Sequence, residues 1–143
     1  MKVNPIVLSA FILLLSAILP SSLSAQNQSG RNVAMHAEEE ANRLQKALNL
    51  EDWQVFYVDS TLQHDLAAII AEYEKLQASK VGNVSLYQDV QDKWMDQIDA
   101  TYKKIFTEQQ WADYLTKAGA AKAIKAREKR KAKAQGETGK KKK

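Results

Sequence analysis

His36, Glu39 and Glu40 are the residues whose types and spacing first suggest chemistry. An imidazole followed by carboxylates three and four positions later lies on one face of a helix, where a divalent ion could bind. The alternative is a solvated helix start, since only His36 and His64 supply imidazole in the whole chain. The pattern therefore leaves both a metal site and a plain surface open.

No residue pattern indicates catalysis. Asp92, Asp96 and Asp99 recur at helical spacing, but no basic or metal-binding partner sets them apart from a solvated helix face. The chain lacks Cys, which excludes thiol catalysis, thiolate metal sites and disulfide bonds. There is also no Gly-rich phosphate loop. We expect a protein that is not an enzyme and uses no cofactor.

Aromatic side chains indicate a binding function. Ten of them follow position 25, and a thin helical protein of this size has difficulty enclosing them all. Rings that pack in the core need no further role. Uncovered rings would contact an unfolded polypeptide, or a second copy of the chain in a homodimer. The residues predicted for this contact are Trp53, Phe56, Trp94, Phe106, Trp111 and Tyr114.

The charge is divided unequally along the chain. Residues 26–116 contain 8 Lys and Arg against 15 Asp and Glu, a net charge of −7, whereas residues 117–143 contain 12 against 2, a net charge of +10. Outside the cytoplasm such a tail would meet anionic lipids, envelope polymers or acidic proteins, and we expect no nucleic acid partner. A solvated, frayed end is the alternative. The residues predicted to contact an anionic surface are Lys125, Arg127, Lys129, Arg130, Lys131 and Lys133.

Residues 1–25 have the pattern of a secretory signal peptide. Lys2 precedes an apolar run from Ile6 to Leu19, which Pro20 and a group of small residues ending at Ala25 then close. A permanent membrane anchor is the alternative, but a span needs about 20 apolar residues and this run is shorter. We expect a periplasmic or secreted protein after cleavage.

The elements that must position these residues are all helical. Apolar positions recur three and four residues apart over 33–48, 52–79, 85–105 and 107–134, and no strand pattern competes. Two long helices joined by a tight turn must lie antiparallel. The predicted fold is therefore all-α, an elongated antiparallel helical hairpin with two shorter flanking helices, about four helices in total. Its helical domain spans 33–135, between a disordered leader, 26–32, and a disordered basic tail, 136–143.

Two short motifs mark the corners of this fold. Thr107 is predicted to cap a helix, and Gln110 three residues on completes a capping box. Leu50-Glu51-Asp52-Trp53-Gln54 is a second, weaker corner of the same kind. Both resemble the Leu-Thr-x-x-Gln motifs of the periplasmic Spy/CpxP-like proteins. Phe106 replaces the Leu of one motif, and Glu51 replaces the Thr of the other, so that corner lacks the capping hydroxyl.

The resemblance implies a small exported helical protein that acts as an ATP-independent chaperone or as an envelope-stress protein. We therefore expect this chain to bind unfolded or partly folded polypeptides. A rival hypothesis is a structural envelope protein that adheres to anionic polymers or lipids through its basic tail. A divalent-metal sensor, built on His36 and its neighbouring carboxylates, is a third.

Overall fold

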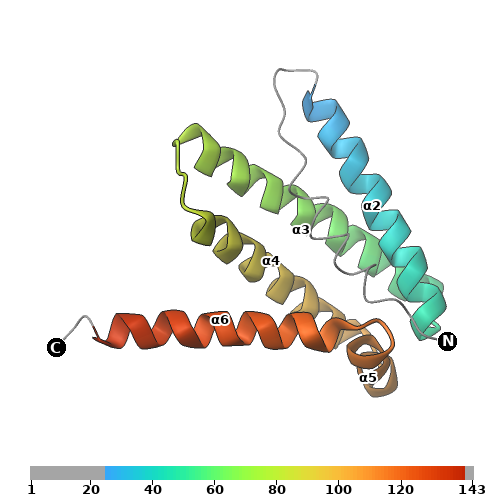
Figure 1. Ribbon diagram of the computed structural model, residues 1–143. Coiled ribbons are helices and arrows are strands. Elements are labelled where there is room, and N and C mark those ends of the chain that lie inside the picture. Colours follow the sequence, from blue (N-terminus) through green and yellow to red (C-terminus); the bar gives the residue numbers. More distant parts are fainter. Residues whose placement is uncertain (1–24, 141–143) are drawn as a thin grey trace.

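The computed structural model describes residues 25–140, and this part of the chain is helical, with no strand (Figure 1). The prediction of an all-α fold is confirmed. The five helices of the described range are α2 (Ala25–Leu48), α3 (Asp52–Ala78), α4 (Val84–Ile105), α5 (Glu108–Thr116) and α6 (Ala120–Lys140). No helix within 25–140 is long and apolar enough to cross a membrane. The predicted signal peptide and residues 141–143 lie outside this range, apart from Ala25.

The helix count differs from the prediction because the fourth predicted segment is two helices. Gly119 separates α5 from α6 and has a φ of 78°. Glycine takes this left-handed conformation without the steric cost that a Cβ atom brings, so the chain turns sharply there. The prediction of a single helix over 107–134 was therefore wrong.

Helix caps explain the other boundaries. Lys80, with a φ of 53°, takes a left-handed conformation just after α3 and ends that helix. Asn83 caps α4, since its Oδ1 accepts a hydrogen bond from the Ser85 amide at 3.0 Å. The helix predicted over 85–105 thus begins at Val84.

The first and last helices of the described chain are longer than expected. Helix α2 begins at Ala25 and includes the predicted leader, 26–32. Helix α6 continues to Lys140, past Gly136 and Gly139, into the predicted disordered tail. A glycine inside a helix costs only about 1 kcal/mol, and the Ala and Lys residues before them favour helix.

Helix α3 is central and packs against α2 and α4. These three helices have 24, 27 and 22 residues, and α6 has 21, so the described range has four long helices and the short α5 where two long and two short ones were predicted. Helix α5 packs against α2 and α6. Figure 1 shows α6 along one edge of the molecule, on the α4 side.

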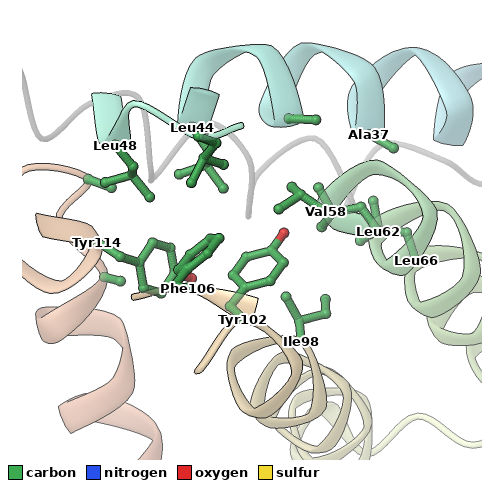
Figure 2. Close-up of a cluster of buried hydrophobic side chains, with 14 of the residues drawn as sticks. Ala37, Leu44, Leu48, Val58, Leu62, Leu66, Ile98, Tyr102, Phe106 and Tyr114 are labelled. Carbon is green, nitrogen blue, oxygen red and sulfur yellow. The ribbon is translucent and has the colours of Figure 1, made fainter. Parts of the chain in front are cut away.

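The core follows the predicted spacings. Figure 2 shows Leu44, Val58 and Tyr102, from three different helices, pointing toward one another. Small residues at Ala37 and Ala41 let α2 and α3 approach closely. The buried hydrophobic residues of α2, α3 and α4 are Val33, Ala37, Ala41, Leu44, Leu48, Val58, Leu62, Leu66, Ile69, Ile98 and Tyr102.

Candidate functional site

The two predicted corners are built locally as capping motifs. At the start of α5 the Thr107 hydroxyl accepts from the Gln110 amide at 3.2 Å, and Gln110 Oε1 accepts from the Thr107 amide at 2.9 Å. The predicted capping box at Thr107 is therefore confirmed. At the start of α3, Gln54 Oε1 accepts from the Glu51 amide at 2.9 Å in the same way.

The two corners also bind each other. Gln54 Nε2 donates to Gln110 Oε1 at 2.7 Å, and Gln110 Nε2 donates to Gln54 Oε1 at 3.0 Å. Gln54 Nε2 further donates to the Ile105 carbonyl at 2.8 Å, and Gln110 Nε2 to the Asn49 carbonyl at 3.4 Å. Each acceptor carbonyl lies two residues before the cap of the opposite corner, so the arrangement has local two-fold symmetry. Both side-chain amides use their full set of two donors and two acceptor sites.

Three aromatic residues at the start of α3 form an exposed group, the aromatic patch. Trp53, Phe56 and Tyr57 are 50%, 66% and 51% exposed. The Tyr57 ring contacts both others edge to face, with centroid distances of 6.2 Å to Trp53 and 5.8 Å to Phe56. Trp53 and Phe56 were among the predicted contact residues. Tyr57 was not, although its spacing four residues after Trp53 places it on the same helix face.

The other four predicted contact residues do not join the patch. Phe106 and Tyr114 are buried in the core, where both contact the Tyr102 ring. Trp111 is partly buried against Tyr114 at 5.4 Å between centroids. Trp94 is also partly buried and donates its indole hydrogen to Glu72 at 2.9 Å. Packing against the rest of the chain occupies these rings.

Helix α6 is held to α4 by an ion-pair ladder, formed by Asp92, Asp96 and Asp99 with Arg127, Arg130 and Lys131. Arg130 binds both carboxylate oxygens of Asp92 at 2.7 Å. Arg127 Nε donates to Asp96 at 2.8 Å, its Nη2 donates to Asp99, and Lys131 also pairs with Asp96. The interpretation of the three aspartates as a solvated face without partners was therefore wrong. Carboxylates at i, i+4 and i+7 facing cations at i, i+3 and i+4 were the signal that could have revealed the pairing.

Burial shifts the pKa values of Asp99 and Tyr114, at the buried end of this ladder. Asp99 also accepts a hydrogen bond from the Tyr114 hydroxyl at 2.7 Å. Loss of hydration raises the pKa of Asp99 above its ordinary value, despite the opposing effects of Tyr114 and Arg127. Burial raises the pKa of Tyr114 well above its ordinary value, so this phenol remains a donor. The carboxylate of Asp92 raises the pKa of Arg130.

The six residues predicted to contact an anionic surface are divided between two faces of α6. Arg127, Arg130 and Lys131 belong to the ladder, and Arg127 is only 5% exposed. Lys125, Lys129 and Lys133 are exposed. Half of the predicted set thus binds the protein's own acidic helix.

One of the three predicted metal residues, Glu40, is bound by a neighbouring arginine. His36 Nδ1 lies 3.6 Å from Glu39, but both Glu40 oxygens bind the Arg43 guanidinium at 2.6 Å. Among the side chains that the structure describes, residues 29–136, there is no group of three or more His, Cys, Asp or Glu placed to hold a metal ion.

Taken together, fold and surfaces define an all-helical protein with an exposed aromatic patch and a basic helix docked on an acidic one. Comparison of the chain with protein-family models, curated proteins and solved structures finds no match. The resemblance to the Spy/CpxP-like proteins therefore rests on the two corner motifs alone.

Proposed function

We propose that this protein is an exported, ATP-independent polypeptide-binding protein of the Spy/CpxP-like type, a chaperone or envelope-stress protein. One observation carries the proposal: Trp53, Phe56 and Tyr57 stand next to one another with half or more of each side chain exposed. Adjacent exposed aromatic rings are typical of protein-binding surfaces, because they offer large apolar area at low cost in side-chain entropy. In this proposal α3, supported by α2 and α4, is the counterpart of the elongated hairpin of such proteins.

The size of the aromatic patch fits weak, reversible binding. Three half-exposed aromatic side chains offer roughly 300 Å² of contact area. Covering that area yields about 7 kcal/mol, and the entropy lost on association offsets much of it. A client held this weakly dissociates without an energy source, as a chaperone that works without ATP requires.

Charges beside the aromatic patch favour a particular client. Glu51 and Asp52 are exposed at the corner that precedes it, and Glu51 accepts the Trp53 indole hydrogen at 2.6 Å. Carboxylates beside an apolar surface attract basic groups from a distance and orient them. We therefore expect extended client segments that combine Lys or Arg with apolar residues.

The test is suppression of aggregation of a chemically denatured client by the exported protein at stoichiometric amounts. The decisive variant is Trp53→Ser with Phe56→Ser and Tyr57→Ser. Its matched control, Met35→Ser with Val84→Ser and Leu86→Ser, removes three other apolar side chains that are 49%, 79% and 40% exposed. We expect the patch variant to lose suppression and the control to retain it.

Two results would count against the proposal. A wild-type protein that leaves aggregation unchanged is not a chaperone of this kind, and equal losses in both variants would mean that the patch has no special role. Sedimentation across a range of protein concentrations distinguishes the homodimer. If the patch joins two copies, the patch variant turns a dimer into a monomer.

A further inference from the structure

Helix α6 is basic on two sides, and only one of them forms ion pairs with the described side chains, residues 29–136. The inner side carries the ladder residues Arg127, Arg130 and Lys131. Lys122, Lys125, Lys129 and Lys133 are all exposed and recur at i, i+3, i+7 and i+11, which places them along the opposite face. We call these four residues the lysine row. At 1.5 Å per residue the row is about 16 Å long.

The positive charge of the lysine row is not neutralised within the described chain. None of its four ammonium groups forms an ion pair with the side chains of residues 29–136, whereas the three cations of the inner side all do. Between residues 120 and 136, α6 contains seven Lys and Arg against the single carboxylate of Glu128. Four like charges on one face repel one another, so a partner that supplies negative charge there is favourable.

The ladder also compensates negative charge near α6. Residues 26–116, which we call the acidic body, have a net charge of −7. The ladder pairs Asp92, Asp96 and Asp99, the carboxylates of α4 nearest to α6, with cations of the inner side. With those charges compensated, the field outside the lysine row remains positive. Figure 1 shows α6 along one edge, with α2, α3 and α4 to one side of it.

The shape of the lysine row selects the kind of polyanion. A straight helix presents all four ammonium groups to a plane at once, whereas a flexible acidic chain would have to become ordered along it. Ala126, the residue between Lys122 and Lys129 on this face, is small, and no large apolar side chain is available to insert into a bilayer. Contact would therefore stay at the level of the headgroups.

We propose that the lysine row is a docking surface for anionic phospholipid headgroups, which holds α6 flat on a membrane and turns the acidic body away from it. Each lysine near such a surface strengthens binding about five-fold, so removing three should weaken it about 100-fold. Salt screens the contact, and binding should fall steeply as ionic strength rises.

The test is sedimentation of the mature protein, which begins after the predicted signal peptide 1–25, with vesicles of phosphatidylcholine containing phosphatidylserine, and with vesicles of phosphatidylcholine alone. The row variant is Lys125→Gln with Lys129→Gln and Lys133→Gln. The matched control, Lys46→Gln with Lys75→Gln and Lys80→Gln, removes the same charge from exposed positions on the other helices and their connections. We expect the row variant to lose about 100-fold in binding to anionic vesicles and the control less than about five-fold.

Several outcomes would overturn the proposal. They are equal losses in both variants, binding to neutral vesicles, no binding by the wild type, and soluble polyglutamate that displaces the protein from vesicles at equal charge concentration. The last result would identify an acidic polypeptide as the partner instead.

Thermal unfolding monitored by circular dichroism checks that the row variant remains folded. Its suppression of client aggregation should be unchanged, because the lysine row and the aromatic patch lie on different helices. The two proposals can therefore fail separately.

Discussion

Gln54 and Gln110 each connect local and long-range structure within one side chain. Each carboxamide oxygen accepts from the amide of its own helix cap, and each carboxamide nitrogen donates to a carbonyl of the other corner. Gln54 is 2% exposed, so water cannot replace these partners when the side chain is removed. The corners of the fold therefore depend on these two residues for more than helix initiation.

Gln54→Ala is predicted to destabilise the protein by about 2 to 3 kcal/mol, because it leaves the Ile105 carbonyl and the Glu51 amide without their buried partner. Urea unfolding at neutral pH measures the change. Gln63→Ala is the control, at an exposed glutamine of the same helix. Its side chain donates to Asp59, one turn earlier in α3, at 2.7 Å. Gln63→Ala should cost less than about 0.5 kcal/mol. Equal effects of the two substitutions would show that the contact between corners adds nothing.

At the scale of elements, the boundary between α5 and α6 controls where the basic helix points. Gly119 is the residue that turns the chain, and Ala118 and Ala120 on either side of it are buried. A continuous helix through 119 would carry Arg127 away from its aspartate partners on α4. The break at Gly119 is thus what allows the ion-pair ladder to form.

Gly119→Ala is predicted to destabilise the protein by about 1 kcal/mol, since a Cβ atom is strained at a φ of 78°. The space around the site is open, with no heavy atom within 4 Å of the added Cβ, so the cost comes from the backbone alone. Gly82→Ala is the control, because that glycine is equally open and lacks the positive φ. Gly82→Ala should be neutral or slightly stabilising. Thermal unfolding monitored by circular dichroism measures both variants. A neutral Gly119→Ala would mean that the turn tolerates another conformation.

At the scale of the whole molecule, Asp99 lies where three helices meet. It belongs to α4, accepts from Tyr114 of α5 at 2.7 Å and pairs with Arg127 of α6. Removing one partner of such a buried ion pair destabilises the folded protein, because the remaining charge stays buried without compensation. The acidic body and the basic helix are therefore coupled at this point, and their coupling should respond to pH.

Because loss of hydration raises the pKa of Asp99 above 3.8, the folded protein holds this proton more tightly than the unfolded chain does. The resulting contribution to stability is full below the unfolded pKa and is lost as pH rises through the folded pKa. Wild type should therefore lose stability relative to Asp99→Asn as pH increases above 3.8. Urea unfolding midpoints of both proteins, measured from pH 3.8 upwards, give the difference in stability. The contributions of the other titrating groups cancel in this difference.

Asp89→Asn, at an exposed carboxylate of the same helix, is the control for loss of a negative charge. A difference between wild type and Asp99→Asn that is constant, or that changes in the opposite direction with pH, would contradict the assignment of burial as the dominant cause.

Local interactions account for what could be predicted from the sequence. Apolar spacing of three and four residues identified the helices, and Thr107 with Gln110 marked a corner, because both signals act within one or two helical turns. Val58, Leu62 and Ile69 lie within the predicted helix 52–79 at this spacing, and they form part of the buried side of α3. The sequence by itself therefore determined the all-α class and much of the core.

Only the tertiary structure decided which aromatic residues remain exposed and which charges have partners. Phe106 and Tyr114 have the same chemistry as Phe56 and Tyr57, and only the neighbouring helices bury the first pair and leave the second uncovered. The ladder joins residues 28 to 38 positions apart, across a turn whose direction Gly119 sets. Periodicity defines the faces of a helix, but what covers each face depends on how distant segments pack, and no local pattern contains that information.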